Sequence, residues 1–243
     1  MGGARESVCE VASAMQQLPL GVRIPDREVF ESFLPARNLQ AVEHALQLAS
    51  GAATGATWIC GPAACGKTHL LQAVCARAGE KGGRAGYFPL AQLASLGVEV
   101  LEGLTLLECV CLDDVDRVVG QLEWERALFA VLREIQEKEG RLVVAAKAPP
   151  ALLSWKLPDL GSRFTAAAIF QLRELDEAEQ QQALQLRARL RGFELPDDTS
   201  RWLQRRFPRD MRTMYELLDT LDEAALVAQR RLTIPFIRSV LKE

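Results

Sequence analysis

The octapeptide Gly61–Thr68 has the residue types and spacing of a phosphate-binding loop. It reads Gly61-Pro62-Ala63-Ala64-Cys65-Gly66-Lys67-Thr68, which fits G-x-x-x-x-G-K-[ST] at every position. The two glycines permit turns that let backbone amides face phosphate oxygens. A helix that begins here, with His69 in its first turn, adds the positive end of its dipole.

This loop predicts a bound nucleotide. Lys67 is expected to reach the β- and γ-phosphates, and the Thr68 hydroxyl to ligate Mg²⁺. The alternative is a glycine-rich turn that binds nothing. A lysine at a helix start opposes the dipole unless an anion is present, which favours the nucleotide.

A pair of acids follows an apolar run in the second candidate motif. Leu106–Leu112 reads as a strand, and Asp113 and Asp114 come directly after it. Carboxylates at the carboxyl edge of a parallel sheet would lie next to the phosphate loop. Asp113 is expected to hold Mg²⁺ directly or through water, and Asp114 to orient an attacking water. The alternative is a pair of helix-capping residues.

Apolar periodicity supplies the elements that must position these residues. An amphipathic helix is expected over Asn38–Leu48, with Asn38 as its cap. Strands and helices then alternate, which predicts a parallel sheet with helices on both faces. The expected strands are Thr57–Cys60, Arg84–Phe88, Leu106–Leu112, Arg141–Ala146 and Ala166–Leu172, and the expected helices Thr68–Ala78, Ala91–Leu96 and Glu123–Glu137.

After Leu172 the pattern becomes entirely helical. Segments near 177–191, 198–207, 209–229 and 234–242 are separated by Gly192, Pro196, Pro208 and Thr233. We therefore expect a flexible arm over 1–22, an α/β nucleotide-binding domain over 23–172 and a small helical domain over 173–243.

Composition excludes several classes of function. The net charge of −3 is unsuited to general binding of nucleic acid or anionic membranes, and no apolar run reaches the ~20 residues of a membrane span. Six cysteines lack C-x-x-C spacing, which favours buried free thiols in the cytoplasm over a zinc site: Cys9, Cys60, Cys65, Cys75, Cys109 and Cys111. A redox role for Cys65, inside the phosphate loop, is left open.

Several segments resemble the DnaA-related AAA+ family. Gly66–Ala73 (GKTHLLQA) and Asp113-Asp114-Val115-Asp116 resemble the nucleotide-binding module of that family. Leu157–Arg163, Gln182–Pro196 and Arg231–Pro235 are similar to its Hda group. The resemblance covers nearly the whole chain.

The resemblance implies further site residues and partners. Arg163 matches the arginine finger that reaches a neighbouring subunit's nucleotide, and Arg212 matches the arginine of the helical lid that contacts nucleotide. Gln17-Leu18-Pro19-Leu20 resembles the peptide by which Hda proteins dock on the β sliding clamp of DNA polymerase. Against these stand plainer interpretations: surface arginines in charged helices, and a chance pairing of leucines beside a proline.

The chain also departs from the family pattern. Ala145 and Ala146 stand where the family places a small hydroxyl or an acid beside the γ-phosphate, and a methyl group cannot position water. Because the sequence ends at Glu243, we do not expect the DNA-binding domain that DnaA carries after its lid. From Gln171 onward 13 basic residues meet 13 acidic ones, so this region does not predict a DNA-binding surface.

The resemblance therefore implies a negative regulator of replication initiation. Such a protein holds ADP or ATP with Mg²⁺, is tethered to the sliding clamp and stimulates hydrolysis of DnaA-bound ATP through Arg163. Contact with DNA would be indirect, through the clamp, and no membrane partner is expected. The alternative is a stand-alone ATPase or helicase-loader-like factor. The preferred nucleotide, the hydrolysis of the chain's own ATP and a homo-oligomer are left open.

Overall fold

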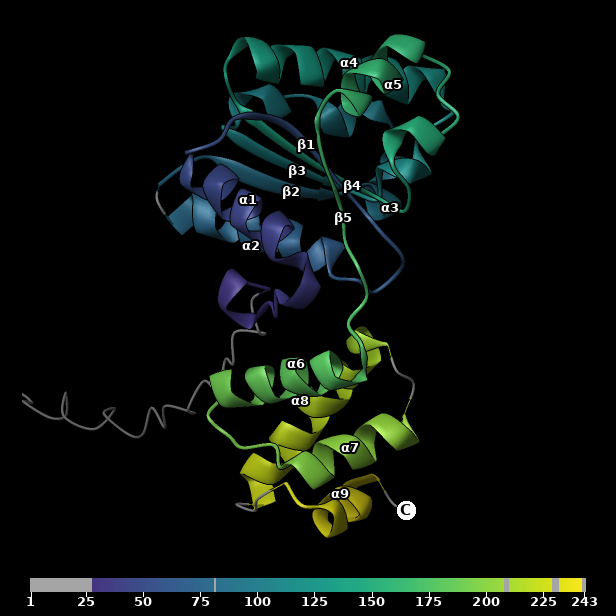
Figure 1. Cartoon of the computed structure of the whole chain (residues 1–243). Helices are drawn as coiled ribbons and strands as arrows, with labels where there is room; N and C mark the ends of the chain where they lie inside the picture. Colours follow the sequence, from purple (N-terminus) through teal and green to yellow (C-terminus); the bar gives the residue numbers. More distant parts are fainter. Residues whose placement is uncertain (1–27, 81, 208–209, 229–231, 242–243) are drawn as a thin grey trace, which may run out of the picture.

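The computed structural model describes residues 28–80, 82–207, 210–228 and 232–241. Its centre is a five-stranded parallel sheet with the order β2-β3-β4-β1-β5 (Figure 1). The strands are β1 (Gly55–Cys60), β2 (Ala85–Pro89), β3 (Cys109–Asp113), β4 (Arg141–Ala146) and β5 (Ala168–Gln171). This is the sheet that the alternating pattern predicts.

The central strands are buried on both faces because helices pack on each. Side chains alternate between two cores: Trp58 and Val144 face one, while Ile59 and Val143 face the other. The first core includes residues of α4 (Leu122–Glu137) and α5 (Pro158–Thr165). The second includes residues of α1 (Leu39–Ser50) and α2 (Lys67–Glu80).

Short helical elements fill the connections of this domain. They are the α-helix α3 (Leu90–Leu93) and the 3-10 helices η1 (Phe30–Ser32), η2 (Ala36–Asn38), η3 (Ala94–Leu96), η4 (Val98–Leu101), η5 (Leu104–Leu106), η6 (Val115–Arg117) and η7 (Pro150–Leu152).

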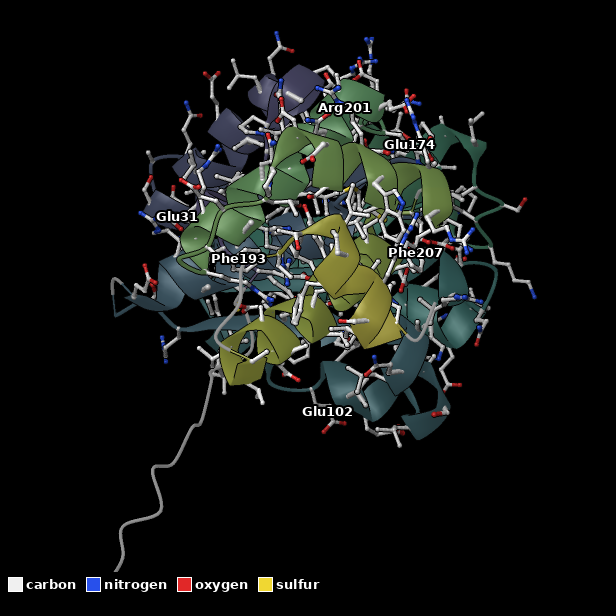
Figure 2. All side chains as sticks on the ribbon, turned by 90° about the horizontal axis from the view of Figure 1, so that it is seen from below. Glu31, Glu102, Glu174, Phe193, Arg201 and Phe207 are labelled. Carbon is white, nitrogen blue, oxygen red and sulfur yellow. The ribbon has the colours of Figure 1, made fainter. Side chains whose placement is uncertain are left out.

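Four helices with a core of their own follow the sheet. They are α6 (Glu177–Leu190), α7 (Asp197–Arg206), α8 (Met211–Ala228) and α9 (Ile234–Leu241). Each of the four helices contributes to that core, and Leu184, Leu203, Leu218 and Ile237 are examples. Figure 2 shows these helices in front of the sheet domain. We call this unit the lid.

Three local predictions need correction. Asn38 precedes α1, but its side chain bonds the backbone of Arg173 instead of capping the helix. Leu106 ends η5, so the third strand begins only at Cys109. The apolar pattern also predicts no helix over Pro158–Thr165, where α5 carries Arg163.

No helix within the described ranges combines the length and the apolar character required to cross a bilayer.

Candidate functional site

The phosphate loop leaves the carboxyl end of β1 and leads into α2, as its sequence requires. Gly61 and Gly66 have positive φ angles of 154° and 98°, and Ala64 also adopts the left-handed region with φ 59°. A Cβ at Gly61 would lie 2.7 Å from the Leu172 carbonyl oxygen. The tip, Pro62 to Ala64, is exposed to solvent. The loop thus has the turns that a cradle of amide groups requires.

Lys67 places its ammonium group inside this turn. Only 8% of the residue is exposed, and Nζ donates to the carbonyl oxygens of Gly61 at 2.8 Å and Pro62 at 2.6 Å. Cys65 lies close by, with Sγ 3.8 Å from Nζ. Burial raises the pKa of the Cys65 thiol, with Lys67 opposing the rise.

Asp113 and Thr68 form a pair of oxygen donors at the edge of the loop. Thr68 Oγ1 donates to Asp113 Oδ2 at 2.7 Å, and the Tyr87 hydroxyl donates to the same oxygen at 2.8 Å. Asp113 is 2% exposed. Hydroxyl and carboxylate oxygens are the ligands that Mg²⁺ prefers, and Mg²⁺ in such sites is completed by phosphates and water. The residues present therefore fit a magnesium–nucleotide.

Tyr87 was not anticipated from the sequence. It lies on β2 beside β3, and burial followed by the charge of Asp113 raises the pKa of its hydroxyl. The hydroxyl therefore stays a donor and fixes the orientation of Asp113. A tyrosine in the strand adjacent to an acid-terminated strand was the available signal.

Asp114 has a backbone conformation that is uncommon for residues other than glycine. Its φ of 54° and ψ of 42° lie in the left-handed region, and its side chain makes no capping bond to η6. The capping interpretation of this pair is therefore not supported by the hydrogen bonds of Asp114. Burial, and then the negative charges of Asp113 and Asp116, raise the pKa of its carboxyl.

The end of β4 lies between the loop and the acids. Ala146 is paired with Cys60, and both Ala145 and Ala146 are fully buried with only methyl groups to offer. The next residue turns outward: the Lys147 amide donates to Asp116 Oδ1 at 3.2 Å. β4 therefore contributes no hydroxyl or acid from these two positions.

On the lid side, charged residues approach the loop from α6, α8 and the chain before η1. Arg212 is an exposed residue in the first turn of α8, which Asp210 caps through the Thr213 amide at 2.9 Å. Burial raises the pKa of Glu28, while the charges of Arg187 and Arg212 oppose that rise. Arg187 itself packs over the Tyr215 ring of α8, with its guanidinium carbon 4.2 Å from the ring centre.

His69 is turned away from the loop's tip. Its Nε2 lies 2.9 Å from the Val29 carbonyl oxygen and 3.1 Å from Ser32 Oγ, and its ring packs edge-on against Phe33. Burial lowers the pKa of His69 to about 4. Its side chain holds the preceding segment of the chain, while its backbone amide belongs to the first turn of α2.

Arg163 lies outside the phosphate loop region, on the surface formed by α4 and α5. Its guanidinium carbon is 5.0 Å from the centre of the Phe129 ring, and Nη1 donates to Gln136 Oε1 at 3.3 Å. The residue is exposed. This placement leaves the guanidinium accessible to another molecule.

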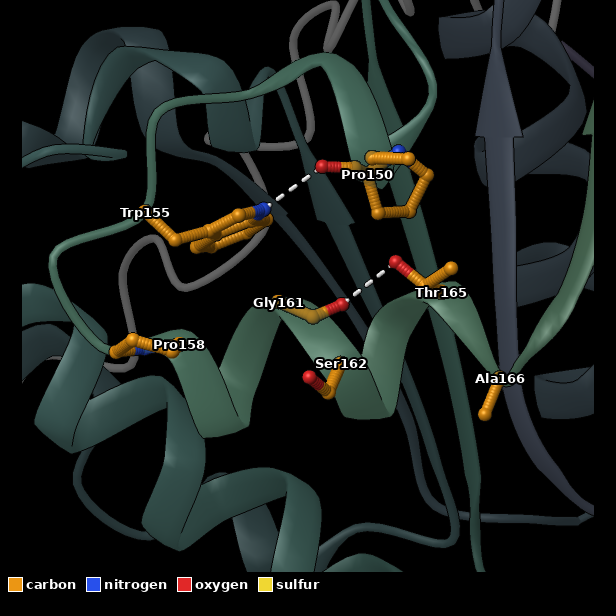
Figure 3. A pocket seen from close by; sticks show the side chains of 8 residues that line it. Pro150, Trp155, Pro158, Gly161, Ser162, Thr165 and Ala166 are labelled. Carbon is orange, nitrogen blue, oxygen red and sulfur yellow. Dashed lines mark hydrogen bonds between the residues drawn. The ribbon is translucent and has the colours of Figure 1, made fainter.

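A shallow cavity of about 440 Å³ lies on a different side of α5 (Figure 3). Trp155 donates its indole N–H to the Pro150 carbonyl at 2.8 Å, and Thr165 donates to Gly161. These polar groups are satisfied within the chain. The cavity contains none of the phosphate-loop residues, and the chemistry of the site does not involve it.

Gln17, Leu18, Pro19 and Leu20 lie outside the described residues, as does Cys9. The clamp-binding peptide therefore stays a prediction.

The fold and the loop together are those of AAA+ P-loop proteins. Three solved structures share this fold. Domain III of the Thermotoga maritima replication initiation protein DnaA matches with a TM-score of 0.72 and 21% identity over 89% of this chain and 96% of that one. AMPPCP-bound DnaA from Aquifex aeolicus matches with a TM-score of 0.65 and 22% identity over 80% and 65%. The RuvB Holliday junction branch migration motor of Thermotoga maritima matches with 0.57 and 19% over 88% and 72%.

A family model matches the lid. Residues 176–241 match the family model described as "Hda, lid domain". The lid therefore resembles that of Hda proteins, and the likeness of the rest of the chain to DnaA is one of fold.

Proposed function

We propose that this protein binds an adenine nucleotide with Mg²⁺ and, docked on the sliding clamp, stimulates hydrolysis of the ATP bound to DnaA. The observation that carries the proposal is the position of Arg163. It is exposed on α5, held by Phe129 and Gln136 and separate from the chain's own phosphate loop. An arginine so placed suits action on a nucleotide held by another subunit.

The chain's own site is a nucleotide holder in this proposal. Gly61 to His69 supply backbone amides and the Lys67 charge, while Thr68 and Asp113 would hold Mg²⁺, which neutralises phosphate charge when bound. Arg212 would contact the nucleotide from α8. The solved DnaA structures with AMPPCP support a nucleotide of this class. We favour ADP, as the family resemblance implies.

Weak hydrolysis of the chain's own ATP follows from β4. Ala145 and Ala146 offer methyl groups where a polar side chain would orient water. Asp114 alone then has to position the nucleophile. The chemistry would therefore belong to a composite site in which this chain supplies Arg163 to DnaA.

The decisive experiment measures ATP turnover by DnaA with clamp-loaded DNA. Arg163→Ala is expected to lose the stimulation, since such fingers contribute on the order of 10³-fold or more. Arg133→Ala is the matched control, because Arg133 is an exposed arginine on α4 whose ion pair, at 3.4 Å, is with neighbouring Glu137. Equal stimulation by the Arg163 and Arg133 variants would refute the role of Arg163.

Clamp docking needs its own test. Replacing Leu18 and Leu20 by alanine is expected to abolish retention on immobilised clamp, because these leucines would fill an apolar pocket. The double variant should keep nucleotide binding. Retention equal to that of the unaltered protein would remove the clamp from the proposal.

The alternative function is a stand-alone ATPase. The intact set of Lys67, Thr68, Asp113 and Asp114 favours it, whereas the alanines of β4 oppose it. Turnover by the purified chain alone, at ATP well above its dissociation constant, separates the two. Brisk turnover that Asp114→Asn abolishes would favour the alternative.

A further inference from the structure

The segment 28–38, which we call the strap, lies between the phosphate-loop helix and the lid. In Figure 1 it is the purple segment between α1 and α2 on one side and α6 on the other. It contains η1 and η2 and precedes α1. The strap therefore contacts both units of the protein.

Its first end is fixed to the phosphate loop. The Val29 carbonyl can only accept, so His69 Nε2 carries the hydrogen and donates to it at 2.9 Å. Ser32 Oγ, 3.1 Å from the same nitrogen, also donates to Val29 O at 3.0 Å. Phe33 lies directly on the loop, since a Cβ at Gly66 would come within 2.8 Å of its ring. The side chains of Ser32, Phe33 and His69 are all buried.

Its second end is fixed to the start of the lid. Asn38 is 5% exposed and makes two bonds to the Arg173 backbone, donating to the carbonyl at 2.9 Å and accepting from the amide at 2.8 Å. Arg37 adds ion pairs to Asp176 and Glu179, the capping box of α6. The ion pairs are partly exposed and contribute little. The buried amide of Asn38 is the stronger attachment, because breaking it leaves buried polar groups unpaired.

We infer that the strap couples nucleotide binding to the position of the lid, with His69 and Asn38 as the positioning residues at its two ends. The inference rests on the proposed nucleotide site. Nucleotide phosphates order the loop at Gly66 and Lys67, which Phe33 and His69 adjoin. The strap transmits this order to Arg173 and α6, so that Arg212 is held over the nucleotide. By reciprocity, a correctly placed lid increases nucleotide affinity.

The test compares amide hydrogen exchange with and without ADP–Mg²⁺ in the full chain, together with calorimetric affinity. In the unaltered protein ADP is expected to slow exchange in the first turns of α2 and in α6. In the His69→Ala and Asn38→Ala variants, ADP should still slow exchange in α2. The factor by which ADP slows exchange in α6 should fall at least tenfold, and ADP should bind several-fold more weakly. His69→Gln retains a donor near Nε2 and should restore the effect.

Glu31→Ala is the control within the strap, because Glu31 makes a surface ion pair with Arg77 and lies away from both anchors. It should behave as the unaltered protein. If His69→Ala does not fold, Ser32→Ala removes one partner of the same cluster and takes its place.

The outcomes separate the two proposals. Undiminished slowing in α6 in both the His69 and Asn38 variants would overturn the coupling while leaving the nucleotide site intact. Absence of any ADP effect in α2 of the unaltered protein would overturn the nucleotide site and the coupling with it.

Discussion

Burial of His69 makes the stability of the sheet domain sensitive to mildly acidic pH. The pKa of this side chain is about 4 in the folded chain, against 6.5 for an unperturbed histidine. The unfolded chain therefore binds a proton at His69 near pH 6.5, whereas the folded chain binds it only near pH 4. The stability that neutral His69 contributes is fully present above pH 6.5 and is lost as the pH falls toward 4.

The magnitude follows from the two pKa values. Between pH 7.5 and 5.5 the linkage relation gives a loss of about 1.3 kcal/mol in the free energy of unfolding from His69 alone. His69→Gln keeps an N–H donor but cannot titrate, so its curve should lack this loss. Contributions from His44, whose pKa burial also lowers, and from Glu28 occur in both proteins and cancel.

The assay is urea unfolding followed by tryptophan fluorescence at a series of pH values. Both proteins carry Trp202→Phe, which leaves Trp58, Trp124 and Trp155 as reporters of the sheet domain. Parallel curves for the two proteins between pH 7.5 and 5.5 would refute the argument that His69 is buried in the neutral form.

Four further predictions concern packing and polar contacts. Gly161→Ala should destabilise by about 1–3 kcal/mol in thermal unfolding, because its Cβ would lie 2.5 Å from the Trp155 ring. Gly79→Ala, in α2 with open space around it, should stabilise by about 0.5–1 kcal/mol, and a loss of stability there would contradict the packing argument. Glu125→Ala should cost about 2–4 kcal/mol in urea unfolding, since fully buried Glu125 accepts the Gly120 and Leu157 amides at 2.6 Å each. The control Glu123→Ala, at an exposed position, should change the free energy of unfolding by no more than about 0.5 kcal/mol. Equal losses at Glu123 and Glu125 would show that the buried hydrogen bonds of Glu125 do not stabilise the fold. Tyr87→Phe should weaken ADP binding about 2–10-fold with Mg²⁺ and less in its absence, because the hydroxyl orients Asp113. If calorimetry finds the same loss of ADP affinity with and without Mg²⁺, Tyr87 does not act through the metal site.

The sequence predicts well where one local signal acts alone. Arg141–Ala146 is a strand at both predicted ends because an unbroken apolar run suits a strand buried on both faces. The phosphate loop follows β1 and opens α2 because its glycines and lysine have few other uses. In both cases local propensity and tertiary packing favour the same structure.

Prediction fails where a distant segment competes. Asn38 has the residue type of a helix cap, yet the Arg173 backbone, far along the chain, offers its amide two partners. α5 was missed because Pro158 and Gly161 suggest a break, whereas Pro158 suits a helix start and Gly161 makes room for Trp155.

The same reason separates the predicted site residues from those that were missed. Thr68 and Asp113 belong to motifs, and the structure brings them within 2.7 Å of each other. Tyr87 joins them only through the sheet order, which places β2 beside β3. The spacing of residues along the chain does not predict such contacts.

The connection between the sheet domain and the lid is short and anchored at both ends. The Leu172 amide donates to the Cys60 carbonyl at 2.7 Å, next to the start of the phosphate loop, and the Arg173 amide donates to Asn38. Asp176 already caps α6 through the Glu179 amide. Only Glu174 and Leu175 lie between these anchors, so a rotation of the lid has two residues in which to pivot. A larger rotation of the lid has to shift the backbone beside Gly61. The connection between the two domains and the phosphate loop then move together.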